Sequence, residues 1–200
     1  MNLVRHSYGR RVYYDTATHT YVKHFPGEKK LSTLLKYAIR FRRSPGKNFL
    51  HISNKLKSLH IETLDVVKAS DFLVVTAERH EPTLEEFLAE CNNDIKQEIN
   101  AKFLDFVVTV LNAGITLIDY DHTNFLYDGT NIIAIDLDNY RDDPFYSRPK
   151  NKVLNYIEHY NGKAFRNEVA RRWTKSTVSQ RIIDFFYGWR GKYATYHIVR

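Results

Sequence analysis

The 200-residue sequence is poor in the residues that mark extracellular, membrane-spanning and zinc-binding proteins. Cys91 is the only cysteine, so neither an intramolecular disulfide nor a cysteine-rich zinc site can form. A single thiol fits a reducing compartment, and the N-terminus lacks the apolar core of a signal peptide. No run of about 18 apolar residues occurs, so no helix is expected to span a membrane. We therefore expect a cytoplasmic protein.

Several common catalytic and binding signatures are also missing. The nine histidines form no H-E-x-x-H pattern, and no G-x-S-x-G sequence occurs, which argues against zinc and serine hydrolases. No helix-turn-helix, zinc-finger or RNP signature is found, so we expect no specific nucleic acid partner. The net charge of +7 nevertheless favours an anionic partner, such as nucleotide phosphates, an acidic glycolipid or a membrane face.

Hydrophobic residues make up 43% of the chain, enough for a folded core. Alternating apolar residues predict four strands before residue 80, at 11–14, 20–25, 64–67 and 72–77. Apolar residues at helical spacing predict helices at 29–43, 47–59 and 95–113, with Ser44-Pro45-Gly46 breaking the first and Gly114 ending the third.

Local turn and capping signals complete this order of elements. Thr83 and Glu86 stand at the spacing of a capping box, so a helix is expected to begin there. Asp128-Gly129 predicts a tight turn between strands at 125–127 and 132–135. Residues 150–200 are expected to form two or three helices. Strands followed by helices in this order favour the α+β class.

The stretch IDYDHTNFLYDGTNIIAIDLD, residues 118–138, carries the strongest chemical signal. Asn124 follows Asp119 by five residues, and an apolar strand leads into Asp136 twelve residues later. Protein kinases place a catalytic Asp, a metal-binding Asn and a metal-binding Asp in this way. We interpret Asp119 as the residue that accepts or orients the proton of the attacking hydroxyl group. Asn124 and Asp136 are interpreted as ligands of Mg²⁺.

Two further residues are expected to bind the nucleotide. Lys23 lies on the second predicted strand, where a lysine can pair with the phosphates of ATP. The strand at 72–77 leads into a hinge, where backbone groups near Glu78 would contact adenine. The alternative interpretation is that Asp119 caps a loop, Asp136 merely ends a strand and Lys23 is solvated. Asp138 either assists metal binding or is a surface residue.

The chain resembles the small kinases that phosphorylate sugars of the lipopolysaccharide inner core, the heptose and Kdo kinases. The resemblance covers roughly residues 10–140 and is carried above all by residues 114–138, whose ending Ile135-Asp136-Leu137-Asp138 is similar to the I-D-[FL]-D of that group. It implies a protein-kinase-like fold, ATP and Mg²⁺ as cofactors, and a sugar hydroxyl on a glycolipid as the acceptor.

The sequence departs from the kinase pattern at three places. No glycine-rich loop precedes Lys23, Leu117 stands where a histidine is usual, and the helix predicted at 47–59 has no glutamate to pair with Lys23. Glu28 and Glu62 are the alternatives for that partner. A catalytically degenerate, pseudokinase-like binding module and a kinase of another small molecule, such as an aminoglycoside or choline, therefore stay open.

The resulting prediction is an α+β, two-lobed, protein-kinase-like fold with a reduced N-lobe at residues 1–79 and a helical C-lobe at residues 80–200. The predicted activity is ATP-dependent phosphorylation of a lipopolysaccharide-core-type sugar. The basic helix at 29–43 and the aromatic, basic residues near the C-terminus could contact the inner face of the cytoplasmic membrane.

Overall fold

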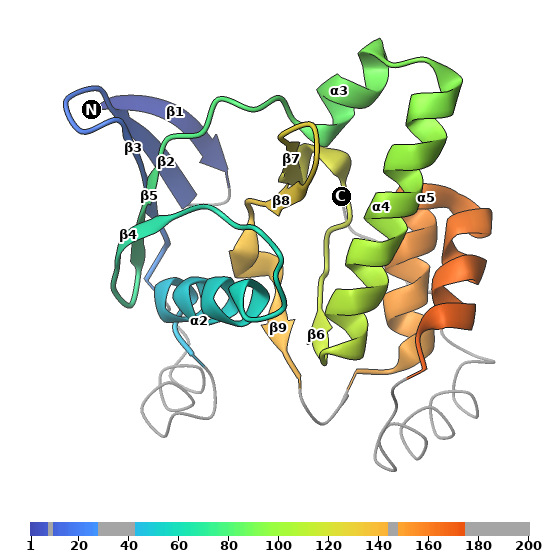
Figure 1. Cartoon of the computed structure of the whole chain (residues 1–200). Helices are drawn as coiled ribbons and strands as arrows, with labels where there is room; N and C mark the ends of the chain where they lie inside the picture. Colours follow the sequence, from blue (N-terminus) through green and yellow to red (C-terminus); the bar gives the residue numbers. More distant parts are fainter. Residues whose placement is uncertain (8–9, 28–42, 144–147, 175–200) are drawn as a thin grey trace. The chain divides into compact units, whose positions relative to one another are not determined.

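A computed structural model describes residues 1–7, 10–27, 43–143 and 148–174 (Figure 1). These residues form two compact units. The first unit comprises Met1–Lys96 and His122–Arg141, and the second comprises Gln97–Asp121 and the part of the chain from Asp142 onwards. The lobe boundary at residues 79 and 80 divides the chain in a different way and stays a prediction.

The first unit is built on an antiparallel five-stranded sheet with the strand order β1-β2-β3-β5-β4. Its strands are β1 (Asn2–Ser7), β2 (Arg10–Asp15), β3 (Thr20–His24), β4 (Val66–Ala69) and β5 (Leu73–Ala77). The β2–β3 hairpin confirms the first two predicted strands. β1 was not predicted, and it covers the outer edge of β2. The strand expected at 64–67 lies two residues further on, at β4.

Helix α2 (Pro45–Lys57) packs against β4 and β5 and buries the predicted apolar face, including Phe49, Ile52 and Leu56. The prediction placed its start at Lys47, but it begins at Pro45. Proline suits the first turn of a helix, because backbone N–H groups there have no hydrogen-bond partner within the helix and proline has no N–H group. Ser44-Pro45-Gly46 is thus the beginning of a helix. The basic helix predicted at 29–43 lies outside the described residues, except for Arg43.

The predicted capping box is present at the start of α3 (Leu84–Glu90). The Thr83 hydroxyl accepts a hydrogen bond from the Glu86 amide, and the Glu86 carboxylate accepts one from the Thr83 amide. The predicted hairpin is also confirmed, as β7 (Phe125–Tyr127) and β8 (Ile132–Ala134). Short 3₁₀ helices precede and follow it, η1 (His122–Asn124) and η2 (Leu137–Asn139).

Helix α4 (Asn93–Asn112) confirms the predicted long helix, and its residues from Gln97 onwards belong to the second unit. Five of the apolar residues at helical spacing, on which the prediction of this helix rests, are buried: Ile99, Phe103, Phe106, Val107 and Val110. Gly114 follows the helix with a φ of 76°, the left-handed conformation that glycine adopts after helix ends. Two short strands complete the assignment in this region, β6 (Ile115–Thr116) and β9 (Arg141–Asp142).

Helix α5 (Lys150–Arg172) supplies the other half of the helical core. Phe165 lies against Phe103 of α4, with ring centroids 5.6 Å apart. Gly162, with a φ of 79°, interrupts the helix and divides it into two helical pieces. The two or three helices expected at 150–200 stay a prediction, because residues 175–200 lie outside the described part of the chain. No helix among the described residues is long and apolar enough to cross a membrane. The α+β class predicted from the sequence is confirmed.

Candidate functional site

Lys23 and the Ile135-Asp136-Leu137-Asp138 segment meet in the first unit. Lys23 lies on β3 in the middle of the sheet, opposite Val12 of β2 and Val74 of β5. Its ammonium group contacts the Oδ1 atom of Asp136 and lies 2.5 Å from the Oδ1 atom of Asp138. It also lies over the ring of Phe25, 5.5 Å from the centroid. The prediction that Lys23 lies close to Asp136 therefore matches the geometry, across 113 positions of sequence.

The two carboxylates differ in their partners and in their burial. Asp138 is only 4% exposed, and its second oxygen, Oδ2, lies 2.9 Å from the guanidinium group of Arg10. Asp136 is 22% exposed, and its Oδ2 accepts a hydrogen bond of 2.8 Å from the side-chain amide of Asn139. Asp138 thus has a cation at each oxygen, whereas Asp136 shares one cation and one neutral donor.

The different surroundings of the two carboxylates shift their pKa values in opposite directions. Burial and the negative charge of Asp136 together raise the pKa of Asp138 to about 6, although the Lys23 ammonium opposes them. Burial also disfavours the charged form of Asp136. For that carboxylate, the Lys23 charge and the hydrogen bonds outweigh burial and lower the pKa to about 2. Asp136 is therefore the stronger acid of the pair.

The β7–β8 hairpin brings Asn124 next to the same segment. Asn124 directly precedes β7, and its carbonyl group accepts a hydrogen bond of 3.2 Å from the amide of Ile135. Asp136 follows Ile135, so the two predicted metal ligands lie at neighbouring positions on the open end of one hairpin. The pairing of Phe125 with Ala134 fixes this register. One carboxylate and one amide oxygen suit Mg²⁺, which completes its shell with water and substrate oxygens.

Metals that need a cage of protein ligands have no such site among the described residues. There, no group of three or more histidine, cysteine, aspartate or glutamate side chains could hold a metal ion. The pair formed by Asn124 and Asp136 fits a different kind of ion, a hard divalent cation that arrives with a phosphate-bearing ligand.

Asp119 belongs to the second unit and is half-buried there. Its Oδ1 atom accepts a hydrogen bond of 3.1 Å from the amide of Asp121, which fixes the loop. Asp119 also interacts with Tyr160 of α5. Burial raises the pKa of the Tyr160 phenol, and the charge of Asp119 and a hydrogen bond to it act in the same direction. The side-chain amide of Asn161 donates to the Tyr120 carbonyl, at 3.4 Å, and ties α5 to this loop.

Glu78 follows β5, where the hinge was predicted. Its amide donates to the His19 carbonyl, and the amide of His80 donates to the Glu81 carboxylate. Adenine recognition by these two amides is therefore in competition with existing hydrogen bonds. The Glu78 carboxylate accepts a hydrogen bond of 2.8 Å from the Tyr14 phenol, which raises the pKa of Tyr14 to about 12.

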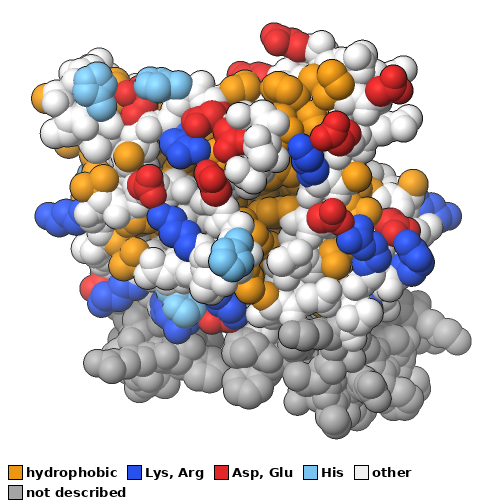
Figure 2. Space-filling view, in the orientation of Figure 1, with side chains coloured by type: hydrophobic (Ala, Val, Ile, Leu, Met, Phe, Trp, Pro, Cys, Tyr) orange, Lys and Arg blue, Asp and Glu red, His pale blue; other side chains and the backbone are white. Residues whose placement is uncertain are grey.

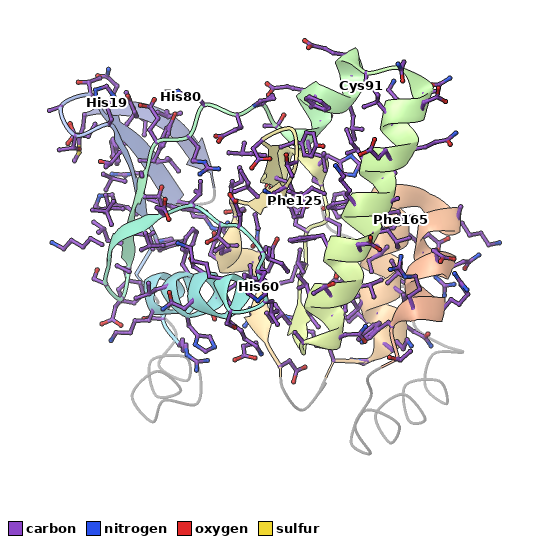
Figure 3. All side chains as sticks on the ribbon, viewed as in Figure 1. His19, His60, His80, Cys91, Phe125 and Phe165 are labelled. Atoms are coloured by element: carbon purple, nitrogen blue, oxygen red, sulfur yellow. The ribbon has the colours of Figure 1, made fainter. Side chains whose placement is uncertain are left out.

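Two histidines flank this carboxylate at the same end of the sheet (Figure 3). The Glu78 Oε2 atom lies 3.1 Å from Nδ1 of His19 and 3.8 Å from Nε2 of His80. Glu78 stands four residues along β5 from Val74, the neighbour of Lys23, a span of about 13 Å in an extended strand. The assignment of Glu78 to the nucleotide site stays a prediction.

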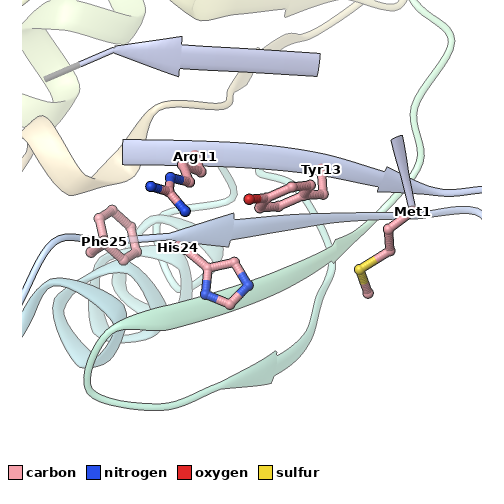
Figure 4. A pocket seen from close by; sticks show the side chains of 5 residues that line it. All are labelled: Met1, Arg11, Tyr13, His24 and Phe25. Atoms are coloured by element: carbon pink, nitrogen blue, oxygen red, sulfur yellow. The ribbon is translucent and has the colours of Figure 1, made fainter. Parts of the chain in front are cut away.

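A separate hollow of about 440 Å³ is lined by Met1, Arg11, Tyr13, His24 and Phe25 (Figure 4). Arg11 pairs with His24 across the β2–β3 hairpin, and Val12 pairs with Lys23. Because side chains alternate between the faces of a sheet, Arg11 and His24 lie on the opposite face from Lys23. This hollow is therefore not the predicted phosphate site.

Sequence reasoning missed Arg10, Asn139 and Tyr160 as members of these clusters, and it left the role of Asp138 open. Asn139 is three residues from Asp136, a spacing that a 3₁₀ turn brings together. Arg10 and Tyr160 reach their partners only through tertiary structure, so no local sequence signal marks them. Glu62, one alternative partner for Lys23, instead contacts Arg79 and Asn131. Glu28 lies outside the described residues.

Basic and acidic side chains are interspersed on the face drawn in Figure 2. Many of the described cations lie close to a carboxylate, for example Lys47 to Asp71 at 2.7 Å and Lys57 to Asp65 at 2.8 Å. The segments expected to contact a membrane lie almost entirely outside the described residues. Membrane contact therefore stays a prediction.

The chain matches no protein-family model and no curated protein. Among solved structures, it is similar to the Rv3197–erythromycin complex from Mycobacterium tuberculosis, with 13% identity and a TM-score of 0.50. That similarity covers all of this chain and 66% of the other. At this identity the likeness concerns the fold alone.

A kinase structure and a phosphotransferase structure are similar at lower TM-scores. The Rio2 kinase complex with ADP, Mg²⁺ and phosphoaspartate from Chaetomium thermophilum has 11% identity and a TM-score of 0.46, covering 94% of this chain and 54% of that one. The ADP-bound aminoglycoside phosphotransferase APH(2″)-Ib has 11% identity and a TM-score of 0.48, covering 96% and 82%. The fold of the described residues is α+β, as predicted, and its protein-kinase-like arrangement stays a prediction. The chain spans 66% of the Rv3197 structure and 54% of the Rio2 kinase structure.

Proposed function

We propose that the chain is an ATP-dependent phosphotransferase. The observation that carries this proposal is the ion pair between Lys23 and Asp136, with Asn124 at the neighbouring position of the hairpin. A kinase needs a cation for the nucleotide phosphates and oxygen ligands for Mg²⁺ in one place. The predicted kinase-like fold and the spacing of Asp119, Asn124 and Asp136 support the same assignment.

Each residue has a defined task in this reaction. Lys23 would bind the phosphates, and Asn124 and Asp136 would hold Mg²⁺, which would neutralise charge on the phosphates. Asp119 accepts the proton of the acceptor hydroxyl. The acceptor oxygen then forms a bond to the γ-phosphorus, the bond from that phosphorus to the β–γ bridging oxygen breaks, and ADP leaves with the electron pair.

The acceptor that we propose is a sugar hydroxyl of a lipopolysaccharide-core-type glycolipid. The resemblance of residues 114–138 to the heptose and Kdo kinases supports this class, and the positive net charge suits an anionic glycolipid. A peripheral position at the inner membrane face belongs to the same proposal. Another small-molecule acceptor is the alternative, since one similar solved structure is a complex with erythromycin and another is an aminoglycoside phosphotransferase.

Turnover of ATP by the purified chain tests the activity. Wild type and the variants Asp119→Asn and Asp136→Asn would be assayed with Mg²⁺ and a panel of core oligosaccharides, aminoglycosides and choline. Asp65→Asn is a suitable control, because it removes an exposed ion pair with Lys57 elsewhere in the structure. We expect both site variants to lose at least about 100-fold in kcat, as removal of a catalytic or charge-stabilising group usually does. Equal turnover in all four proteins would refute the proposal.

A pseudokinase-like binding module is the second candidate. It is favoured by the missing glycine-rich loop and by Leu117 at the usual histidine position. Thermal unfolding with and without Mg-ATP separates an active kinase from a module that does not bind nucleotide. A shift of several degrees that is absent in Asp136→Asn would contradict such a module. No shift in the wild type, together with no turnover, would favour it.

A further inference from the structure

Lys23 has no glutamate partner on helix α2. In protein kinases, a glutamate on the helix that packs against the sheet orients this lysine for the phosphates. Helix α2 has the sequence PGKNFLHISNKLK, which contains no acidic residue at all. A lysine side chain is long and loses considerable rotamer freedom when it is held in one direction. Another anion must therefore hold Lys23 if it is to point at a nucleotide.

Asp138 has the geometry of that anion. It is the more buried of the two carboxylates beside Lys23, at 4% exposure against 22% for Asp136. Its Oδ1 atom accepts from Lys23 at 2.5 Å, and its Oδ2 atom lies 2.9 Å from Arg10. Because both oxygens already have cationic partners and little of the side chain reaches solvent, Asp138 is poorly placed to bind an incoming metal ion.

The backbone that carries Asp138 is held firmly by α2 itself. The 3₁₀ helix η2, which contains Asp138, packs against α2, and its Leu137 side chain is fully buried. The Asn48 side chain on α2 donates a hydrogen bond of 3.0 Å to the carbonyl of Tyr140 at the end of η2. The helix therefore contributes to the lysine site indirectly, by fixing the turn that presents a carboxylate.

We propose that Asp138 is the positioning residue for Lys23, in place of the missing helix glutamate, with Arg10 as its second counter-ion. Lys23 has three N–H donors, so a bond to Asp138 leaves others for phosphate oxygens. Asp136, which is more exposed, is then the carboxylate that would be available to hold the metal. The ion cluster is a property of the protein without nucleotide; its use in catalysis rests on the proposed function.

Chemical labelling of lysines tests the positioning role without any assumption about activity. Wild type, Asp138→Asn, Asp136→Asn and the control Asp65→Asn would be acetylated briefly without nucleotide, and each lysine's labelling would be followed by peptide mass spectrometry. We expect Asp138→Asn to label Lys23 about fivefold faster than wild type, and more than Asp136→Asn does, because the more buried ion pair restrains the ammonium group more. Asp65→Asn should change the rate at which Lys57 is labelled and leave the labelling rate of Lys23 as in wild type.

A conservative variant guards against an effect of misfolding. Asp138→Glu keeps the carboxylate and should return Lys23 labelling to within about twofold of wild type, because the ion pair is retained. The proposal is overturned if Asp136→Asn speeds the labelling of Lys23 as much as Asp138→Asn does. It is also overturned if Asp138→Glu, with a wild-type circular dichroism spectrum, labels as fast as Asp138→Asn.

Steady-state kinetics with Mg-ATP then test the use of this contact. Asp138→Asn should raise KM for ATP about tenfold with a smaller change in kcat, because it misdirects a nucleotide-binding group and leaves Asp119 and Asp136 in place. In a Lys23→Met background the same substitution should change kcat/KM less than about twofold. Equal effects in both backgrounds would overturn the positioning role. Absence of ATP turnover in the wild type would refute the proposed function, while the labelling result would still decide whether Asp138 holds Lys23.

Discussion

Replacement of Lys23 by methionine should destabilise the protein even without nucleotide. Lys23, Arg10, Asp136 and Asp138 form a cluster of two cations and two anions. Methionine keeps most of the volume of the lysine stem but removes the charge, so the cluster gains one net negative charge. The two carboxylates are then left with Arg10 and Asn139 as partners.

The size of the effect follows from burial and hydrogen bonding. Each charge-assisted hydrogen bond contributes roughly 1.5–3 kcal/mol, and breaking a buried ion pair by removing one partner costs about 3–5 kcal/mol. Lys23 is 18% exposed and Asp136 is 22% exposed, so solvent screens part of this loss. We therefore expect the free energy of unfolding to fall by about 2–3 kcal/mol.

Urea denaturation at pH 8, followed by circular dichroism, would measure this loss for wild type, Lys23→Met and the double variant Lys23→Met/Asp136→Asn. The double variant restores the neutral charge of the cluster, so it should regain about 1 kcal/mol relative to Lys23→Met. If the free energy of unfolding of Lys23→Met lay within about 0.5 kcal/mol of wild type, the ion pairs of Lys23 would contribute little to stability. A double variant less stable than Lys23→Met would show that repulsion between the carboxylates is unimportant.

Three smaller perturbations test other parts of the structure. Thr83→Ala removes the cap of α3 and should cost about 1 kcal/mol in urea denaturation. Asp128→Ala should cost about 1 kcal/mol at pH 7, because its carboxylate accepts from the Thr130 and Asn131 amides, both at 2.7 Å. Burial tends to raise the pKa of Asp128, but these hydrogen bonds outweigh it and lower the pKa below 3.8. The stabilisation is therefore fully present above pH 3.8, and the difference between wild type and variant should shrink as the pH falls through the lower, folded-state pKa. Tyr160→Phe should alter kcat by less than about tenfold if the phenol only contacts Asp119 and is not the proton acceptor.

Local sequence signals predicted most of the secondary structure. The capping box at Thr83, the Asp128-Gly129 turn and the apolar face of α4 each depend on residues a few positions apart, so they can be found without tertiary information. Strand β1 could not be found in this way, because its stability comes from pairing with β2. The start of β4 was misplaced by two residues for a similar reason, since pairing with β5 determines where that strand begins.

The candidate site was only partly predictable. Asn124 and Asp136 were identified by spacing, and Lys23 by its place on an early strand. The contact between Lys23 and Asp138, however, joins residues 115 positions apart, and Arg10 enters through the edge of the sheet. The absence of a glutamate from the helix predicted at 47–59 could be seen in the sequence. That Asp138 takes its place could not, because the position of Asp138 depends on how α2 packs against η2.

Gly46 offers a final prediction, since it controls the approach of α2 to the sheet that carries Lys23. A Cβ atom at this position would lie 2.0 Å from the Ser70 carbonyl oxygen and 2.8 Å from that of Leu73. The Gly46 amide also donates a hydrogen bond of 3.0 Å to the Asp71 carbonyl, so the backbone of α2 lies directly against the turn between β4 and β5.

Gly46→Ala should therefore destabilise the protein, even though alanine is favoured over glycine in helices by about 1 kcal/mol. Contacts this short with backbone atoms cannot be relieved by rotating a side chain, and overpacking of this kind costs about 1–3 kcal/mol or more. We expect a net loss of about 2 kcal/mol in urea denaturation. Gly27→Ala is the matched control, because no atom lies within 4 Å of the added Cβ.

The same substitution also connects the packing of α2 to the lysine site. If α2 moves away from the β4–β5 turn, η2 loses part of its support, and Asp138 should hold Lys23 less firmly. Labelling of Lys23 should then increase in Gly46→Ala and not in Gly27→Ala. Destabilisation without faster labelling of Lys23 would contradict the idea that α2 supports the carboxylate, because the helix would have shifted while the ion pair stayed intact.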